Sequence, residues 1–180
     1  MPKKDNLTAV VTGSSGGIGL SVCSSLLIAG YKVLGLDRKT PSLKKEGFIH
    51  VQTDLSSEIE IKRALSGSEG KVSVVVHCAA EQPSIAVGDK DSRVLWQKAF
   101  GVNVLALETL LSELLADLQE AESPRIIVIG SVHDKSTSPR MAPYAVSKAA
   151  LAGWVRSASI DLAKYQIPVI GISAGAVDSP

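Results

Sequence analysis

Short apolar runs alternate along the chain with longer segments in which apolar residues recur every three to four positions. The short runs predict strands at residues 7–12, 32–37, 49–53, 72–77, 125–130 and 168–173. The longer segments predict helices at residues 18–29, 57–65, 92–120 and 144–164. The regular alternation predicts an α/β fold, a doubly wound parallel sheet of about six strands with helices on both faces.

A glycine-rich turn, Gly13-Ser14-Ser15-Gly16-Gly17-Ile18-Gly19, joins the first predicted strand to the first helix. Glycine lets the backbone approach a ligand, and a helix N-terminus presents N–H groups and partial positive charge to a phosphate. A tight turn without a ligand would use glycine too. The second strand ends at Asp37, 18 positions after Gly19, close to the spacing of a ribose-binding carboxylate. We therefore predict a dinucleotide site that includes Gly13, Ser15, Gly17, Ile18, Gly19 and Asp37.

Three polar residues are predicted to meet at the edge of the sheet where the strands end. Tyr144 and Lys148 are four positions apart and share a helix face, and Ser131 directly follows the fifth strand. An ammonium near a phenol favours the phenolate, which suits proton transfer near neutral pH, and a serine hydroxyl can hold a carbonyl oxygen. A tyrosine four positions before a lysine is common on surface helices. The three residues together, behind a dinucleotide turn, favour catalysis.

These motifs resemble the short-chain dehydrogenase/reductase family over almost the whole chain. The resemblance rests on Thr12 with the glycine turn, Asp54-Leu55, Asn103, Gly130-Ser131 and Tyr144-Ala145-Val146-Ser147-Lys148. It implies that Tyr144 is the general acid/base, that Lys148 favours its phenolate and holds the nicotinamide ribose, and that Ser131 orients the substrate carbonyl.

The resemblance also implies roles for residues that the pattern alone would not select. Asn103 would support a water linked to Lys148, and Asp54 and Leu55 would contact the adenine. His77-Cys78-Ala79-Ala80 stands where Asn-Asn-Ala-Gly is common, and the small Ala79 and Ala80 still let the backbone approach the cofactor. Ala174-Gly175 replaces Pro-Gly, and Gly175 still allows close approach to the nicotinamide.

The C-terminus is a further departure, because family members usually continue well past Gly175. If Pro180 is the true end, we expect residues 1–180 to form a single dinucleotide-binding domain without the usual C-terminal substrate-binding segment. Its site would be open and its sixth strand would have an unpaired apolar edge.

Composition narrows the class of protein. The chain carries 19 Lys and Arg against 18 Asp and Glu, without a block of like charge, so we expect neither a nucleic-acid nor a membrane partner. Residues 1–6 do not introduce a signal peptide, and no uninterrupted apolar run reaches a membrane-spanning length, which favours a cytoplasmic location. Cys23 and Cys78 are expected to be reduced packing residues, with a disulfide as the lesser alternative.

The histidines do not indicate a metal site. No His, Cys and Asp cluster has metal-ligand spacing, so we predict no catalytic metal. His50 alternates with apolar neighbours on a strand and is interpreted as structural. His133 lies two positions after Ser131; it either contacts substrate or is an exposed loop residue, and we favour the loop.

The leading hypothesis is an NAD(P)-dependent oxidoreductase that acts on a small-molecule alcohol/carbonyl pair. NAD is preferred because Asp37 would repel a 2′-phosphate; NADP stays possible. The alternatives are a dinucleotide-binding module with little turnover, or a truncated form of a longer reductase. The two long helices carry more apolar surface than one sheet face can cover, and family members commonly pair them, so we expect a homodimer or homotetramer.

Overall fold

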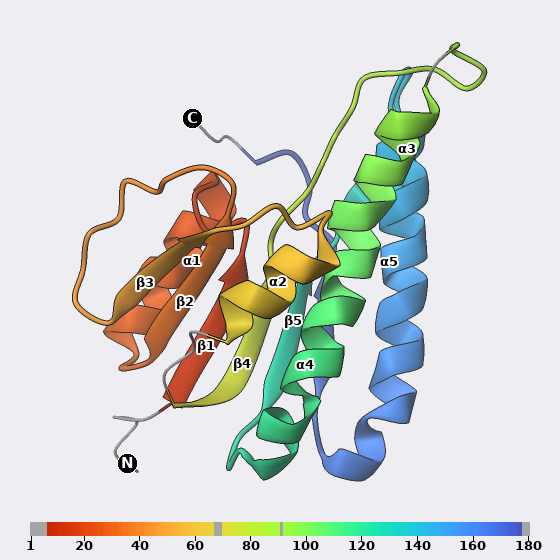
Figure 1. Ribbon diagram of the computed structural model, residues 1–180. Coiled ribbons are helices and arrows are strands. Elements are labelled where there is room, and N and C mark those ends of the chain that lie inside the picture. The colour runs from red at the N-terminus through yellow and green to blue at the C-terminus, as the bar shows by residue number, and fades with distance from the viewer. Residues whose placement is uncertain (1–6, 67–69, 91, 178–180) are drawn as a thin grey trace.

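The computed structural model describes residues 7–66, 70–90 and 92–177; Pro180 lies outside the described residues. Its centre is a six-stranded parallel sheet in the order β3-β2-β1-β4-β5-β6 (Figure 1). The strands are β1 (Leu7–Thr12), β2 (Lys32–Asp37), β3 (Phe48–Gln52), β4 (Lys71–His77), β5 (Arg125–Ile129) and β6 (Val169–Ile172). The strand order changes direction between β1 and β4, which is where a doubly wound sheet binds ligands. The predicted fold class is confirmed.

Helices cover both faces of this sheet. They are α1 (Gly17–Ile28), α2 (Glu58–Leu65), α3 (Arg93–Phe100), α4 (Ala106–Glu120) and α5 (Ala142–Asp161), with short 3₁₀ turns at Val132–Asp134 and Ala163–Tyr165. In Figure 1, α2, α4 and α5 lie on one side of the strands and α1 lies on the other. Two apolar cores follow from this arrangement. One joins the sheet to α2, α4 and α5, and the other joins it to α1.

Small residues lie at the centre of the buried face of helix α1. Ile18, Val22 and Leu26 recur every four positions and share one helix face. The fully buried residues are Gly19 and Cys23, with Val22 and Leu26 partly buried beside them. Ile18 is left free to line the ligand cleft described below. Both cysteines are free thiols.

The long helix predicted at 92–120 is three segments rather than one. A π-helical segment, Gly101–Leu105, separates α3 from α4. Such a segment adds a residue to the turn and commonly marks a functional site, since it re-aims the side chains next to it. Here it points Asn103 inward, where the side chain is fully buried.

The same helical run is long and apolar enough to span a membrane by length and composition. It covers Arg93–Glu120 and contains a window of mean hydropathy 1.5, of which 44% is buried inside the fold. Core helices of soluble proteins pass the same test, so the run is weak support for a membrane segment.

The fold itself buries several leucines of the two long helices. Five of them on α4 and α5 are buried in the core: Leu107, Leu110, Leu114, Leu118 and Leu151. These five residues therefore offer no apolar surface to a partner, and self-association through the two helices stays a prediction. The apolar side chains that do reach the surface are fewer and include Leu105 and Ile160, which are 59% and 76% exposed.

Candidate active site

The packing of the protein itself requires glycine at two positions of the turn. Gly13 has a φ of +67°, and a Cβ there would lie 2.7 Å from the Ala79 nitrogen at the end of β4. A Cβ on Gly19 would lie 2.0 Å from the Gly13 carbonyl oxygen. Both glycines are therefore required for the turn to close. A Cβ on Gly16 would meet its nearest neighbour, the Gly13 oxygen, at an ordinary 3.5 Å.

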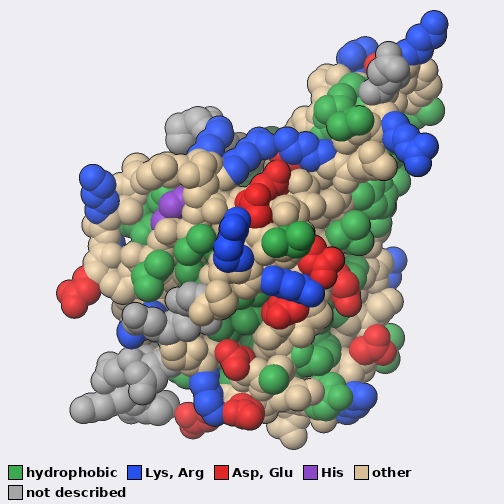
Figure 2. Space-filling view, in the orientation of Figure 1, with side chains coloured by type: hydrophobic (Ala, Val, Ile, Leu, Met, Phe, Trp, Pro, Cys, Tyr) green, Lys and Arg blue, Asp and Glu red, His purple; other side chains and the backbone are tan. Residues whose placement is uncertain are grey.

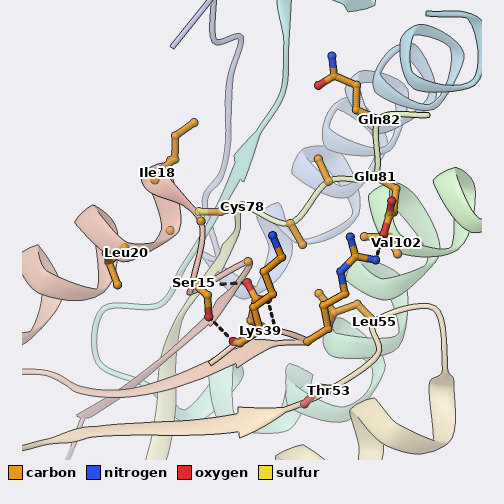
Figure 3. Close-up of a pocket in the computed structure, with 18 of the residues that line it drawn as sticks. Ser15, Ile18, Leu20, Lys39, Thr53, Leu55, Cys78, Glu81, Gln82 and Val102 are labelled. Carbon is orange, nitrogen blue, oxygen red and sulfur yellow. Dashed lines mark hydrogen bonds and ion pairs between the residues drawn. The ribbon is translucent and has the colours of Figure 1, made fainter. Parts of the chain in front are cut away.

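The turn opens the N-terminus of α1 into a cleft of about 540 Å³ (Figure 3). No side chain caps this helix, and no acidic residue lies in its first turn. The partial positive charge of the helix terminus is therefore available to an anionic group. This cradle fits the pyrophosphate of a dinucleotide. The predicted cofactor residues Gly13, Ser15, Gly17, Ile18, Gly19, Asp37, Asp54, Leu55, Ala79 and Ala80 all line the cleft.

At one end of the cleft, Asp37 is held by two backbone donors. The Ser15 N–H donates to one carboxylate oxygen at 3.0 Å, and the Lys39 N–H donates to the other at 2.8 Å. An ionised carboxylate offers about four acceptor positions, so each oxygen retains one. Two free acceptor positions on a half-buried carboxylate match the vicinal hydroxyls of a ribose.

Beside Asp37, the turn that precedes α2 forms the next part of the wall. One Asp54 carboxylate oxygen accepts hydrogen bonds from the Ser56 hydroxyl at 2.7 Å and the Ser56 N–H at 2.9 Å. The hydroxyl bond, more than any other contact, lowers the pKa of Asp54. Ser57 caps α2 by accepting the Glu60 N–H at 3.3 Å, while the Glu60 carboxylate accepts the Asp54 N–H at 2.8 Å. These bonds fix Asp54 and Leu55 at the cleft.

The end of β4 supports the floor of the cleft through a buried hydrogen-bond chain. Thr12 Oγ1 bonds His77 Nδ1 at 2.8 Å and accepts from the Ala79 N–H at 3.3 Å. Burial lowers the pKa of His77 to about 3, so its ring is neutral. The histidine thus braces the end of β4.

A second cavity of about 480 Å³ adjoins the first, sharing Ile18, Cys78 and Ala80 as lining residues. It brings together Ser131, Tyr144 and Lys148, the predicted catalytic residues from the end of β5 and from α5. Gly175, predicted to lie against the nicotinamide, lines it as well. The two cavities therefore form one continuous crevice along the carboxyl ends of β1, β4 and β5.

Lys148 is the most deeply buried charged group in this crevice, at 2% exposure. Its Nζ donates to the Ile129 carbonyl oxygen at 2.8 Å and lies 5.7 Å from the centre of the Tyr144 ring. Burial lowers the pKa of Lys148 to about 8, because the ammonium loses hydration. Its neighbour Cys78 is uncharged near neutral pH, since burial raises the pKa of that thiol to about 12.

Asn103 lines neither cavity but lies directly behind them. Its side chain accepts from the Glu81 N–H at 2.7 Å and donates to the Glu81 carbonyl at 3.0 Å and the Ser147 hydroxyl at 2.8 Å. Glu81 directly follows residues 77–80 at the end of β4, and Ser147 directly precedes Lys148. Asn103 therefore ties the cofactor side of the crevice to the catalytic helix, and its water-mediated role stays a prediction.

Sequence reasoning underestimated His133 and overlooked Ser147. His133 is half-buried, lines the second cavity and contacts the Tyr144 ring edge-on at 5.7 Å between ring centres. The interpretation as an exposed loop residue was wrong, and its position two residues after Ser131 was the available signal. Ser147 is buried, and its hydroxyl donates to the Tyr144 carbonyl at 2.7 Å. Across the residues that the structure describes, no group of three His, Cys, Asp or Glu could hold a metal.

Known proteins that resemble this chain in sequence and in structure belong to one family. The sequence profile of the short chain dehydrogenase family matches residues 7–180. The acetoacetyl-CoA reductase of Acinetobacter sp. (strain RA3849) is 30% identical, across 96% of this chain and 75% of that protein. A solved 4-hydroxyisoleucine dehydrogenase complexed with NADH has a TM-score of 0.86 at 25% identity, covering 97% of this chain and 77% of that one. A short chain dehydrogenase from Burkholderia cenocepacia J2315 in complex with NADP shares the fold, with a TM-score of 0.86 at 22% identity, 98% of this chain and 75% of that one.

The chain spans 60% to 75% of the length of the curated relatives it matches. The match nevertheless runs through every described strand and through both halves of the crevice. The chain therefore belongs to the short-chain dehydrogenase family of nicotinamide-dependent oxidoreductases.

Proposed function

We propose that this protein transfers a hydride between NAD(H) and a small alcohol/carbonyl substrate, with Tyr144 as the proton donor and acceptor. The observation that carries this proposal is the continuous crevice. It joins an uncapped helix N-terminus and a ribose-matching carboxylate at one end to Ser131, Tyr144 and Lys148 at the other. A bound nicotinamide dinucleotide supplies or accepts the hydride there.

The protein's own residues would handle the proton and the substrate oxygen. In the direction of reduction, the Tyr144 hydroxyl gives its proton to the oxygen of the carbonyl group as the carbon receives the hydride. The Lys148 ammonium, 5.7 Å from the ring centre, stabilises the phenolate that remains. The Ser131 hydroxyl, which accepts the His133 N–H at 3.2 Å, is oriented to donate to the same substrate oxygen. Burial of Lys148 strengthens its field on the phenol, since few waters screen it.

A preference for NAD over NADP follows from Asp37. Its two remaining acceptor positions suit two ribose hydroxyls, whereas a 2′-phosphate would bring negative charge against a carboxylate that Ser15 and Lys39 hold in place. Two unit charges about 4 Å apart repel by up to about 4 kcal/mol at an effective dielectric of ~20. Arg38 and Lys39 follow immediately and oppose this repulsion in part.

Two assays test the proposal. Deuterated NADH is incubated with a panel of carbonyl compounds that includes acetoacetyl-CoA and aldoses, and the alcohol product is analysed for deuterium on the former carbonyl carbon. Label in the product supports hydride transfer. A protein that binds NADH in calorimetry yet transfers no label to any member of the panel would favour the binding-module alternative.

Assembly and location are part of the same proposal. A homodimer or homotetramer formed through α4 and α5 and a cytoplasmic setting suit an enzyme of metabolites, and we expect neither a nucleic-acid nor a membrane partner. The near-balance of charges supports that expectation.

A further inference from the structure

Charged side chains gather at the adenosine end of the crevice. Arg38, directly after β2, forms an ion pair through Nη1 with a carboxylate oxygen of Glu81, directly after the β4 motif. Lys98 of α3 approaches the same oxygen at 3.5 Å. Figure 2 shows basic and acidic side chains next to one another along the upper edge of the molecule, over the ends of the strands. Arg38 and Lys98 also lower the pKa of Asp54, which places these cations within electrostatic reach of it.

Glu81 is a fixed partner rather than a mobile surface residue. Its side chain is only 20% exposed, whereas that of Arg38 is 54% exposed. Its backbone N–H and carbonyl are both bonded to the buried side chain of Asn103. In Figure 3 the Glu81 carboxylate lies near Val102, on the wall that Leu55 also forms. The carboxylate therefore stays in place, and the longer Arg38 side chain reaches across to it.

We propose that Glu81 is a cofactor-specificity residue: by holding the Arg38 guanidinium in an ion pair, it withholds from a 2′-phosphate the cation next to Asp37. This inference rests on the proposed function. It gives the crevice two separate reasons to favour NAD, since Asp37 repels the phosphate and Glu81 occupies the arginine that would attract it.

The physical basis is competition for one guanidinium. Arginine binds phosphate strongly through paired N–H donors, so a free Arg38 beside the ribose would favour NADPH. With Glu81 present, the phosphate must displace a carboxylate and also lie near a second negative charge. Glu81→Gln keeps the side-chain shape and both backbone bonds to Asn103 while it removes the charge.

The test is a double-mutant cycle on binding, with calorimetric dissociation constants for NADH and NADPH in the absence of substrate. Glu81→Gln is expected to lower the ratio of the NADPH constant to the NADH constant by about fivefold, the upper end for releasing a partly exposed ion pair. The change should come from tighter NADPH binding, with NADH little altered. In the Arg38→Gln background the same Glu81→Gln substitution should change the ratio much less, because only the direct repulsion between Glu81 and the phosphate is then removed.

The matched control is Glu113→Gln, which removes a carboxylate of α4 that pairs with Lys62 at 3.4 Å, away from the crevice. This substitution changes the net charge by the same amount as Glu81→Gln, and it should not change the ratio of the NADPH constant to the NADH constant. An equal response of Glu81→Gln and Glu113→Gln, or a full effect of Glu81→Gln without Arg38, would overturn the assignment. A wild-type protein that binds neither dinucleotide would overturn the proposed function itself, and the assignment with it.

Discussion

The buried ammonium of Lys148 makes a prediction about stability that does not depend on knowing the substrate. Lys148 is 2% exposed, and its acceptor is an uncharged one, the Ile129 carbonyl. His77 and Cys78 beside it are uncharged, because burial lowers the pKa of the former to about 3 and raises that of the latter to about 12. The buried ammonium therefore lowers the free energy of unfolding, and its deprotonation at higher pH should restore that stability.

The magnitude follows from the pKa of Lys148, which burial lowers from 10.5 to about 8. Between these values the unfolded chain binds a proton on Lys148 that the folded chain does not, so stability rises with pH. Below pH 8 the cost is fully present, and above about 10.5 it is gone. At 1.36 kcal/mol per pKa unit, the gain across the whole window is about 3 kcal/mol, and about 1 kcal/mol appears between pH 8 and 9.

The assay compares the wild-type protein with Lys148→Met by urea unfolding at intervals from pH 7 to pH 10. Met keeps the length of the side chain and cannot ionise. The wild-type free energy of unfolding should rise relative to that of the variant as pH increases. Burial raises the pKa values of Cys23 and Cys78 to about 12, so these thiols lower the free energy of unfolding above about pH 9. This happens in both proteins, so the two contributions largely cancel in the difference. A difference that is constant or falls with pH would refute this description of Lys148.

Three further predictions concern the turn, the ribose carboxylate and assembly. Gly19→Ala should lower the free energy of unfolding by about 1–3 kcal/mol and weaken NADH binding, because its Cβ would lie 2.0 Å from the Gly13 oxygen. Gly16→Ala, with ordinary contacts, is the control, and equal stability of the two variants would contradict this packing. Asp37→Asn should reduce the preference for NADH over NADPH by roughly tenfold or more in calorimetry, given the repulsion it removes; an unchanged ratio would show that Asp37 does not set it. Light scattering at micromolar concentration should find a dimer or tetramer, and a monomer would reject assembly through α4 and α5.

The fold was predictable because its signals are local and repeated. Each strand is a short apolar run, and Asp37 and Ser131 could be placed at the crevice from strand ends alone. Tyr144 and Lys148 followed from one helical spacing. The parallel order of the sheet then brings these distant residues to one edge, as the structure confirms for the crevice as a whole.

What the sequence could not provide depends on contacts between distant segments. The π-helical segment Gly101–Leu105 has no periodic signature, and it is what turns Asn103 toward Glu81 and Ser147. The Arg38–Glu81 pair joins residues 43 positions apart whose side chains meet only because β2 and β4 both flank β1. The burial of the α4 leucines also could not be read from the sequence, since counting apolar positions does not reveal how much surface the neighbouring elements cover.

The proton-transfer role of Tyr144 is the central claim, and Tyr144→Phe tests it most directly. The substitution removes one hydroxyl and keeps the ring that contacts His133. Turnover of the best carbonyl substrate with NADH should fall by about 10²–10⁴-fold, the contribution of a positioned acid/base group, while the calorimetric affinity for NADH is retained. Tyr165→Phe, the same change at a 39% exposed position beyond α5, should leave turnover unaltered. Near-normal turnover in the Tyr144→Phe protein would contradict the account.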